Sequence, residues 1–506
     1  MSEQRPPRRP RPRSATPPAR RARRGDPSRL AAYTLLRAVD DGAYANLELP
    51  KILTRQRLHG RDAAFATELS FGTIRWCGLY DRIIELAASR PVDRLDPGVR
   101  DTLRLGAHQL FGMRVPDHAA ADQTVALARA VNGAGAASLV NAVMRRLSER
   151  SREEWAGEVI PADDATARVA VAQSHPEWIV RALRQALIGH GRATAATVDD
   201  QLECLLVCDN EPPTVALVAR PGLSTVTDLV HAGATPSLVS PIGARLPGGV
   251  PGDIPAIREG RAAVQDEGSQ VLALALAAVN VPPGPRARER WLDLSAGPGG
   301  KAGVLAGLAG QHAQFPGGGA KDEARADLVC VEVSEHRSDL VRSTLRPAIE
   351  QSGGLGVSIE VRTQDGREVG QAEPAAYDRV LVDAPCTGLG ALRRRPEARW
   401  RRSPADLATL GPLQRALLAS AIDATRPGGI IAYSTCSPHL AETRFVIDDV
   451  LKHRRDVELV DARDVVTEVS QAALTDLGCG PTVQLWPHVH GTDGMFLALL
   501  RKLDAG

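Results

Sequence analysis

In residues 28–150 the apolar positions recur three and four apart, which is the spacing of one face of an α-helix. Asp96 and Pro97 mark one helix start, because an aspartate caps free backbone amides and a proline presets the angle of the first turn. Arg145 and Arg146 stand near the end of the last predicted helix, where positive charge suits the helix dipole. The pattern predicts an all-α domain.

The pattern changes in residues 170–262. A helical stretch begins near Glu177, a strand-like run covers Thr214–Val218, and prolines and glycines crowd residues 241–255. We predict a small α+β module here, followed by a helix over residues 269–279.

From residue 263 to residue 504, short apolar runs alternate with helical patterns, which is typical of a mostly parallel sheet covered by helices on both faces. Ligands of such sheets bind beyond the carboxyl ends of the strands. The glycine-rich stretch 310–327 is predicted to be an exposed insertion. The expected strands are Trp291–Leu294, Leu328–Val333, Val357–Val361, Arg379–Val382, Ile430–Tyr433 and Phe496–Leu500.

Length and charge add further limits. A chain of 506 residues exceeds what one core usually supports, which agrees with several domains. No apolar run approaches the roughly 18 residues that cross a bilayer, so we expect no membrane span. Residues 1–24 hold nine arginines and one acid, so this tail carries +8 and the rest of the chain −6 of the net +2. We predict that residues 1–27 are disordered, and they serve either to grip RNA phosphates or to keep the chain in solution.

The seven cysteines are odd in number and form no CxxC pairs, a pattern typical of reduced thiols in the cytoplasm. Cys204 and Cys208 are four positions apart, but no second pair of ligands accompanies them. We therefore predict a cytoplasmic protein without a metal site. The sequence indicates nothing about the oligomeric state.

Three candidate ligand-binding positions follow successive predicted strands. Leu292–Lys301 is a strand that breaks into a glycine-rich turn and opens a helix, a common arrangement among nucleotide and nucleoside binders. Glu332 ends the next strand, where a carboxylate can accept hydrogen bonds from two ribose hydroxyls. Asp365 follows the third strand and is placed to bind an adenine amino group. Together they favour an adenosyl ligand.

Two cysteines follow the next two strands. Asp383-Ala384-Pro385-Cys386 leaves one strand and leads to the arginine-rich stretch Arg393–Trp400, while Cys436 ends the other strand in Ala432–Pro438. A thiolate that adds to carbon 6 of cytosine makes carbon 5 able to attack a methyl sulfonium. Asp383 is a candidate to stabilise charge at ring nitrogen 3 and the exocyclic amine. Arg393, Arg394 and Trp400 are candidates to hold a base outside its stack.

These motifs resemble the NOL1/NOP2/Sun family of RNA cytosine-5 methyltransferases. Three further segments, Arg29–Ala32, Phe65–Tyr80 and Leu139–Arg146, resemble the antitermination factor NusB, an RNA-binding helical fold. A NusB-like domain in front of the methyltransferase domain is similar to the bacterial ribosomal RNA small subunit methyltransferase B type.

The resemblance implies a function and roles for individual residues. It implies S-adenosylmethionine as cofactor, a cytosine of 16S ribosomal RNA as substrate, and a Rossmann-like catalytic domain. Cys436 is then the nucleophile that attacks carbon 6, Cys386 assists product release, and Asp383 and Lys301 lie beside the cytosine. The implied cofactor-binding residues are Ser295, Ala296, Gly297, Pro298, Gly299, Gly300, Lys301, Glu332, Asp365 and Asp383.

Four positions depart from the family pattern. Ser295 and Gly297 stand where Cys and Ala are usual, and Glu332 replaces the commoner Asp. Ala441 stands before Glu442, where an acidic residue is usual.

Three alternatives remain open. The substrate could be transfer RNA or another RNA, and a non-catalytic RNA-binding or antitermination factor could keep an inactive methyltransferase domain. Amino-group methyltransferases share the fold, but they carry an aromatic residue where this chain has Cys386.

Overall fold

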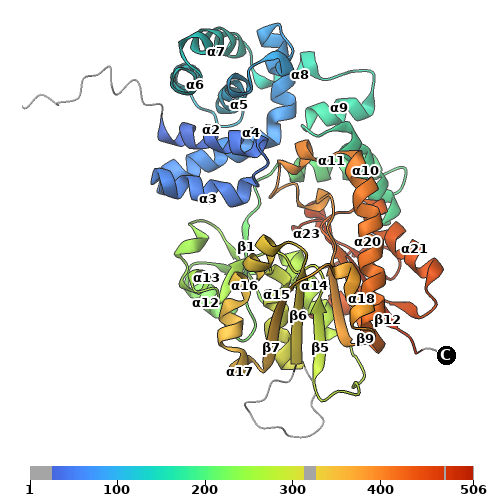
Figure 1. The fold of residues 1–506 in the computed structure, drawn as a ribbon. Coiled ribbons are helices and arrows are strands. Elements are labelled where there is room, and N and C mark those ends of the chain that lie inside the picture. Colours follow the sequence, from blue (N-terminus) through green and yellow to red (C-terminus); the bar gives the residue numbers. More distant parts are fainter. Residues whose placement is uncertain (1–25, 313–325, 472–473, 505–506) are drawn as a thin grey trace, which may run out of the picture. The chain divides into compact units, whose positions relative to one another are not determined.

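The computed structural model describes residues 26–312, 326–471 and 474–504 (Figure 1). The chain divides into two compact units, Met1–Ser174 and His175–Gly506. Residues 1–25 of the predicted disordered tail and most of the predicted insertion at 310–327 lie outside the described residues. For Asp26 and Pro27 the prediction of disorder is wrong, because the Asp26 side chain accepts from the Arg29 amide and caps a helix that begins at Pro27. The two ends of the predicted insertion differ from the prediction, because they belong to regular elements: one helix continues to His312, and a strand begins at Ala326.

The first unit is all-α in its described part. The helices are α2 (Pro27–Asp40), α3 (Ala45–Gln56), α4 (Gly60–Ala88), α5 (Pro97–Phe111), α6 (Asp117–Val131), α7 (Ala134–Leu147), α8 (Arg152–Val159) and α9 (Ala165–Ala172), with a 3-10 turn, η1 (Val92–Arg94), before α5.

Two apolar clusters hold this unit together. One joins α2 and α3 to the first half of α4, and the other joins the second half of α4 to α5 and α7. The predicted helix start is confirmed, since the Asp96 carboxylate accepts hydrogen bonds from the amides of Gly98 and Val99. Leu86 is an exception to the apolar pattern: it is 42% exposed, because it lies on the outer side of α4.

The second unit begins with an α+β module. Its helices are α10 (Glu177–Gly189), α11 (Val198–Asp209), α12 (Val226–His231) and α13 (Pro255–Arg258), with a 3-10 turn, η2 (Pro251–Asp253), before α13. Its strands β1 (Val215–Ala219), β2 (Thr235–Pro236), β3 (Gly243–Leu246) and β4 (Ala262–Val264) form an antiparallel sheet in the order β2-β3-β1-β4. Strand β3 lies within the stretch predicted to be turns, because its short apolar run is embedded among glycines and prolines.

The larger sheet of this unit carries the catalytic motifs. Its strand order is β10-β12-β9-β8-β5-β6-β7, with β11 paired to β12. The strands β5 to β9 run parallel to one another, whereas β12 runs antiparallel to β9 and β10. The strands are β5 (Glu289–Asp293), β6 (Ala326–Glu332), β7 (Val357–Thr363), β8 (Tyr377–Asp383), β9 (Thr425–Thr435), β10 (Val457–Val460), β11 (Val483–Gln484) and β12 (Phe496–Lys502).

Helices cover both faces of this sheet. One face packs on α14 (Glu267–Ala278), α15 (Gly300–His312), α16 (Glu335–Glu350) and α22 (Ala462–Val469), and the other packs on α18 (Val369–Ala372), α20 (Pro404–Ala424) and α21 (Arg444–His453). The remaining short elements are α17 (Ser352–Leu355), α19 (Ala398–Arg401), α23 (Pro487–His490), η3 (Gly366–Glu368), η4 (Leu389–Ala391) and η5 (Leu440–Glu442).

The predicted fold class is therefore confirmed: a helical front part, a small α+β module and a mostly parallel sheet between helices. The predicted strands are present, and most extend beyond the predicted residues. The helix predicted at 269 begins two residues earlier, because Asp266 caps it. Within the described ranges, no helix has the length and apolar character that spanning a bilayer requires.

Candidate active site

The glycine-rich turn joins β5 to α15 at the carboxyl edge of the large sheet. The Gly297–Pro298 peptide bond is cis, and Gly299 has φ +102°, a conformation that glycine adopts without steric cost. The turn delivers Lys301 into the first turn of α15, where its side chain is 8% exposed. The turn therefore places its own backbone and the buried Lys301 amine at the same carboxyl edge of the large sheet.

Lys301 and Asp383 form a partly buried ion pair, in which the lysine side chain is 8% exposed and the aspartate side chain is 34% exposed. The Lys301 Nζ atom lies 2.7 Å from Asp383 Oδ2, and the Ser434 hydroxyl donates to Asp383 Oδ1 at 3.1 Å. Burial opposes the charged amine, but the charge and hydrogen bond of Asp383 outweigh it and raise the pKa of Lys301. A cation and a carboxylate thus stand together at the ends of α15 and β8.

Cys386 and Cys436 face each other across two neighbouring strands. Their sulfur atoms are 3.5 Å apart, although 50 positions separate them in the chain. The hydrogen bond from Cys386 lowers the pKa of Cys436, and Arg395 and Lys301 lower it further against burial. The same hydrogen bond, together with burial, raises the pKa of Cys386 well above its ordinary value. Cys436 is therefore the sulfur that ionises first.

Glu332 and Asp365 lie at the ends of β6 and β7 and have local partners. Glu332 is 4% exposed, and one of its oxygens is 3.3 Å from the guanidinium of Arg337. Asp365 accepts from the backbone amide of Arg367 at 2.9 Å and pairs with the Arg367 side chain, which lowers the pKa of Asp365. Both carboxylates stand on the β6 and β7 side of the turn.

Comparisons with known proteins agree with this geometry. Residues 283–501 match the family model of the 16S rRNA methyltransferase RsmB/F, and residues 26–149 match that of the NusB family. The putative methyltransferase Rv1407 of Mycobacterium tuberculosis is 47% identical over 494 residues, which cover 96% of this chain and 100% of the relative. The probable ribosomal RNA small subunit methyltransferase B of Synechocystis is 30% identical over 491 residues, covering 94% and 99%.

The chain belongs to the ribosomal RNA small subunit methyltransferase B family. Its fold is shared by the solved structure titled "Crystal Structure of PH0851", with a TM-score of 0.74, 21% identity and coverage of 94% of this chain and 99% of that one. Enzymes of this family use S-adenosylmethionine as methyl donor.

The residues at the turn fit that cofactor. The turn from Ser295 to Gly300 offers backbone close to the ends of β5 and β6, and a Cβ atom at Gly297 would collide with the Glu332 carboxylate. The ends of the Glu332 and Arg337 side chains therefore lie directly against the turn at Gly297. Glu332 and Asp365 would hold the ribose and the adenine.

The predicted RNA-contact residues have different surroundings. Arg394 pairs with the buried Asp493, with its Nε atom 2.9 Å from Asp493 Oδ1. Arg393 donates to the Gly491 carbonyl at 2.7 Å, and Trp400 is 38% exposed. Of the three, the structure leaves Trp400 as the side chain with most exposed surface, while Arg394 anchors the segment after Cys386.

Asp293 is a site residue that the sequence prediction did not single out. It ends β5, is 1% exposed, and its pKa is raised to about 7 by burial and by the neighbouring Asp383. The sequence feature that could have identified Asp293 is its position directly before the glycine-rich turn, at the same sheet edge as Glu332 and Asp383. Ser434, Arg395 and Glu442 were also without a predicted role.

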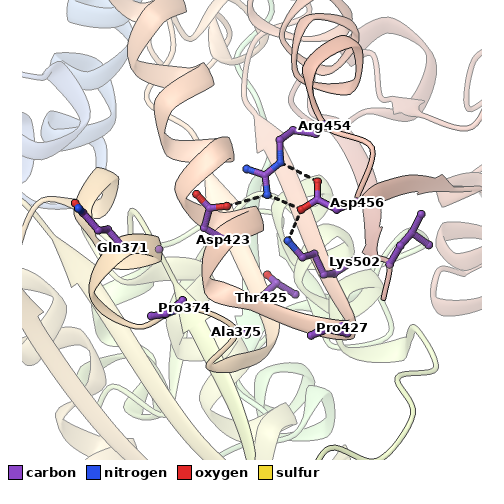
Figure 2. A pocket seen from close by; sticks show the side chains of 11 residues that line it. Gln371, Pro374, Ala375, Asp423, Thr425, Pro427, Arg454, Asp456 and Lys502 are labelled. Carbon is purple, nitrogen blue, oxygen red and sulfur yellow. Dashed lines mark hydrogen bonds and ion pairs between the residues drawn. The ribbon is translucent and has the colours of Figure 1, made fainter. Parts of the chain in front are cut away.

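A cavity of about 340 Å³ lies at the opposite edge of the sheet (Figure 2). Arg454 contacts Asp423 and Asp456, and Lys502 contacts Asp456, so these charges neutralise one another. Thr425 begins β9, whereas Cys436 follows its end, which separates this cavity from the cysteines. We assign it no role in the reaction. The described residues also hold no cluster of three or more potential metal ligands.

Proposed function

We propose that this chain transfers a methyl group from S-adenosylmethionine to carbon 5 of a cytosine in 16S ribosomal RNA, through a covalent bond between Cys436 and carbon 6. The observation that carries the proposal is the 3.5 Å approach of the Cys386 and Cys436 sulfurs, with Lys301 and Asp383 at the same strand ends. The names of the relatives support a small-subunit ribosomal RNA substrate.

Cys436 begins the reaction as a thiolate. Its sulfur forms a bond to carbon 6, and the electron pair of the carbon 5–carbon 6 double bond moves onto carbon 5. Bound S-adenosylmethionine supplies an electrophilic methyl group to that carbon. A base, for which solvent water is available, then takes the proton at carbon 5. The electron pair of that carbon–hydrogen bond restores the double bond between carbons 5 and 6, and the bond from carbon 6 to sulfur breaks, which returns Cys436 as a thiolate.

The neighbouring side chains support these steps. Asp383 is placed to interact with ring nitrogen 3 and the exocyclic amine, where charge develops, and Lys301 and Ser434 hold its carboxylate in position. The Cys386 thiol faces the sulfur that must depart, so it can assist the final step. A partly buried ion pair and two thiols in contact therefore support the proposed reaction.

RNA binding involves surfaces beyond the catalytic residues. We assign RNA contacts to the NusB-like domain at 28–150 and to the α+β module at 170–262. Near the active site, the exposed Trp400 is the candidate to stack on the displaced base, and Arg393 is a candidate for phosphate.

A denaturing gel tests the proposal. Cys386→Ala, Cys386→Ala/Cys436→Ala and the control Cys204→Ala are each incubated with unmodified small-subunit ribosomal RNA transcript and S-adenosylmethionine. Cys204 is an exposed thiol in α11, so its loss leaves the active site intact. We expect a slowly migrating protein–RNA adduct in Cys386→Ala alone, because product release is impaired there.

Other outcomes overturn parts of the proposal. An adduct in the double variant removes Cys436 from the role of nucleophile. No adduct in any variant, with no methyl transfer by the wild type to this RNA, favours transfer RNA or another RNA as substrate. A further failure to bind S-adenosylmethionine favours a non-catalytic RNA-binding or antitermination factor.

A further inference from the structure

Glu442 is a buried carboxylate beside the two cysteines. It ends η5, six positions after Cys436, and is fully buried. Its Oε1 atom accepts from the backbone amide of Thr387 at 2.8 Å and from the Gln414 amide at 3.3 Å, and its Oε2 atom accepts from the Thr387 hydroxyl. All these donors are neutral, and within the described ranges no ion pair to Glu442 is present. The Glu442 carboxyl group is therefore held by hydrogen bonds from neutral groups.

These hydrogen bonds hold the Cys386 loop on both sides of the cysteine. Glu442 binds Thr387 directly, and Gln414 donates to the Pro385 carbonyl at 2.8 Å with the same amide nitrogen that reaches Glu442. The Tyr433 hydroxyl donates to the Glu442 carbonyl at 2.8 Å and so ties η5 to β9. The loop after β8 is consequently fastened to the segment that follows Cys436.

The Glu442 carboxylate also lies next to Cys386, because it accepts from the amide of Thr387, the residue that follows that cysteine. It is one of the causes that raise the pKa of Cys386, after the Cys436 hydrogen bond, burial and the charge of Cys436. For Cys436 the charged neighbours with the largest effects are Arg395 and Lys301, which lower its pKa, and Asp383, which raises it. Arg394 and Tyr433 are further ionisable groups that interact with the two sulfurs.

We propose that Glu442 is a positioning residue that holds Cys386 against Cys436 and places a carboxylate beside the Cys386 loop, so that Cys436 is the more reactive of the two sulfurs. This inference rests on the proposed function for the roles of the two sulfurs. It explains why an acid is present at position 442 even though the acidic residue usual before it is replaced by Ala441.

The test compares the rates at which the two cysteines react with iodoacetamide between pH 6 and pH 10, measured by mass spectrometry of the two cysteine-containing peptides. The variant Glu442→Gln keeps the size and an oxygen acceptor but removes the charge. Glu335→Gln, on the exposed first turn of α16, is the control for loss of one acid. The reaction requires neither RNA nor cofactor, so its result is independent of whether the methylation proposal succeeds.

In the wild type and the control, we expect Cys436 to react about tenfold or more faster than Cys386 at pH 7.5, because reaction requires the thiolate. In Glu442→Gln we expect this ratio to fall by about threefold to tenfold, as Cys386 ionises at lower pH. An unchanged ratio in a folded Glu442→Gln protein overturns the assigned role of the charge. Faster reaction of Cys386 in the wild type overturns the inference without any variant.

Discussion

The two sides of the strand-end edge are held together by different kinds of contact. On the side proposed to bind the cofactor (the cofactor side), at the ends of β6 and β7, Glu332 contacts Arg337 and Asp365 contacts Arg367, which are near neighbours in the chain. On the side proposed to bind the cytosine (the substrate side), at the ends of β8 and β9, Lys301 contacts Asp383 across 82 positions and Glu442 contacts Thr387 across 55. The arginines of the cofactor side are also about half exposed.

The difference indicates which side is preorganised. Exposed, local ion pairs contribute little and are readily exchanged for contacts with a ligand. Contacts made by distant segments require the whole fold, and removing the buried Lys301 leaves Asp383 without its cation. We therefore expect changes on the substrate side to reduce the rate of methyl transfer, and changes on the cofactor side to weaken binding.

The largest effect is expected for Lys301→Met, which keeps the length of the side chain and removes its charge. Asp383 then loses its cation, and the buried Asp293 loses the positive charge that lowers its pKa. Single-turnover methyl transfer should fall by roughly 10²- to 10³-fold, as for other losses of a preorganised charge at a reacting centre. Lys452→Met, at an exposed position of α21, serves as the control. A loss below tenfold would contradict the assigned importance of the pair.

A smaller and pH-dependent effect is expected for Arg395→Leu. Arg395 lowers the pKa of Cys436, so its removal raises that pKa, and the rate should reach half of its maximum at a higher pH. At pH 7 the rate should fall by about tenfold if the pKa of Cys436 rises by about one, because the thiolate fraction falls in that proportion. The loss should disappear at high pH, where Cys436 is ionised in both proteins. Arg395→Lys should restore most of the rate. A loss that is equal at every pH would assign Arg395 to another role.

The same contrast explains what the sequence could predict. The acids of the cofactor side, Glu332 and Asp365, could be predicted because each follows the end of a strand. The alternation of strands and helices in the sequence indicates where those strands end. The meeting of Cys386 with Cys436 was also foreseeable, since neighbouring parallel strands end at one edge. The close approach of the Glu332 side chain to Gly297 required coordinates, because it depends on the space between two loops.

The buried contacts of the substrate side could not be predicted from the sequence, and the reason is physical. Arg394 was a reasonable candidate for RNA because arginines bind phosphate, but Asp493, 99 positions away, occupies its guanidinium. Glu442 lies on a short 3-10 turn whose role depends on its packing against the Cys386 loop. Sequence periodicity predicts which face of an element is buried, and it does not predict which polar groups meet inside.

On the cofactor side, Glu332→Gln should weaken binding of S-adenosylmethionine by about tenfold or more, because a charged acceptor for two hydroxyls is lost. The rate at saturating cofactor should change by less than about threefold, since the substrate side stays intact. Isothermal titration calorimetry and single-turnover rates measure the two quantities. A large loss of rate with unchanged binding would show that the two sides are coupled.

The smallest effect is expected for Asp365→Asn. In the free protein Asp365 is partly exposed and satisfied by Arg367, so part of any gain from an adenine amino group is offset by the contact that it replaces. Asparagine keeps an oxygen acceptor for that amino group. The dissociation constant of S-adenosylmethionine should rise by about twofold to tenfold, below the effect of Glu332→Gln, with no change in the rate at saturation. Glu368→Gln, an exposed neighbour on η3, is the matched control and should bind as the wild type does. If Asp365→Asn weakens binding more than Glu332→Gln, then Asp365 is the dominant contact of the cofactor side, and exposure in the free protein is a poor guide to importance there.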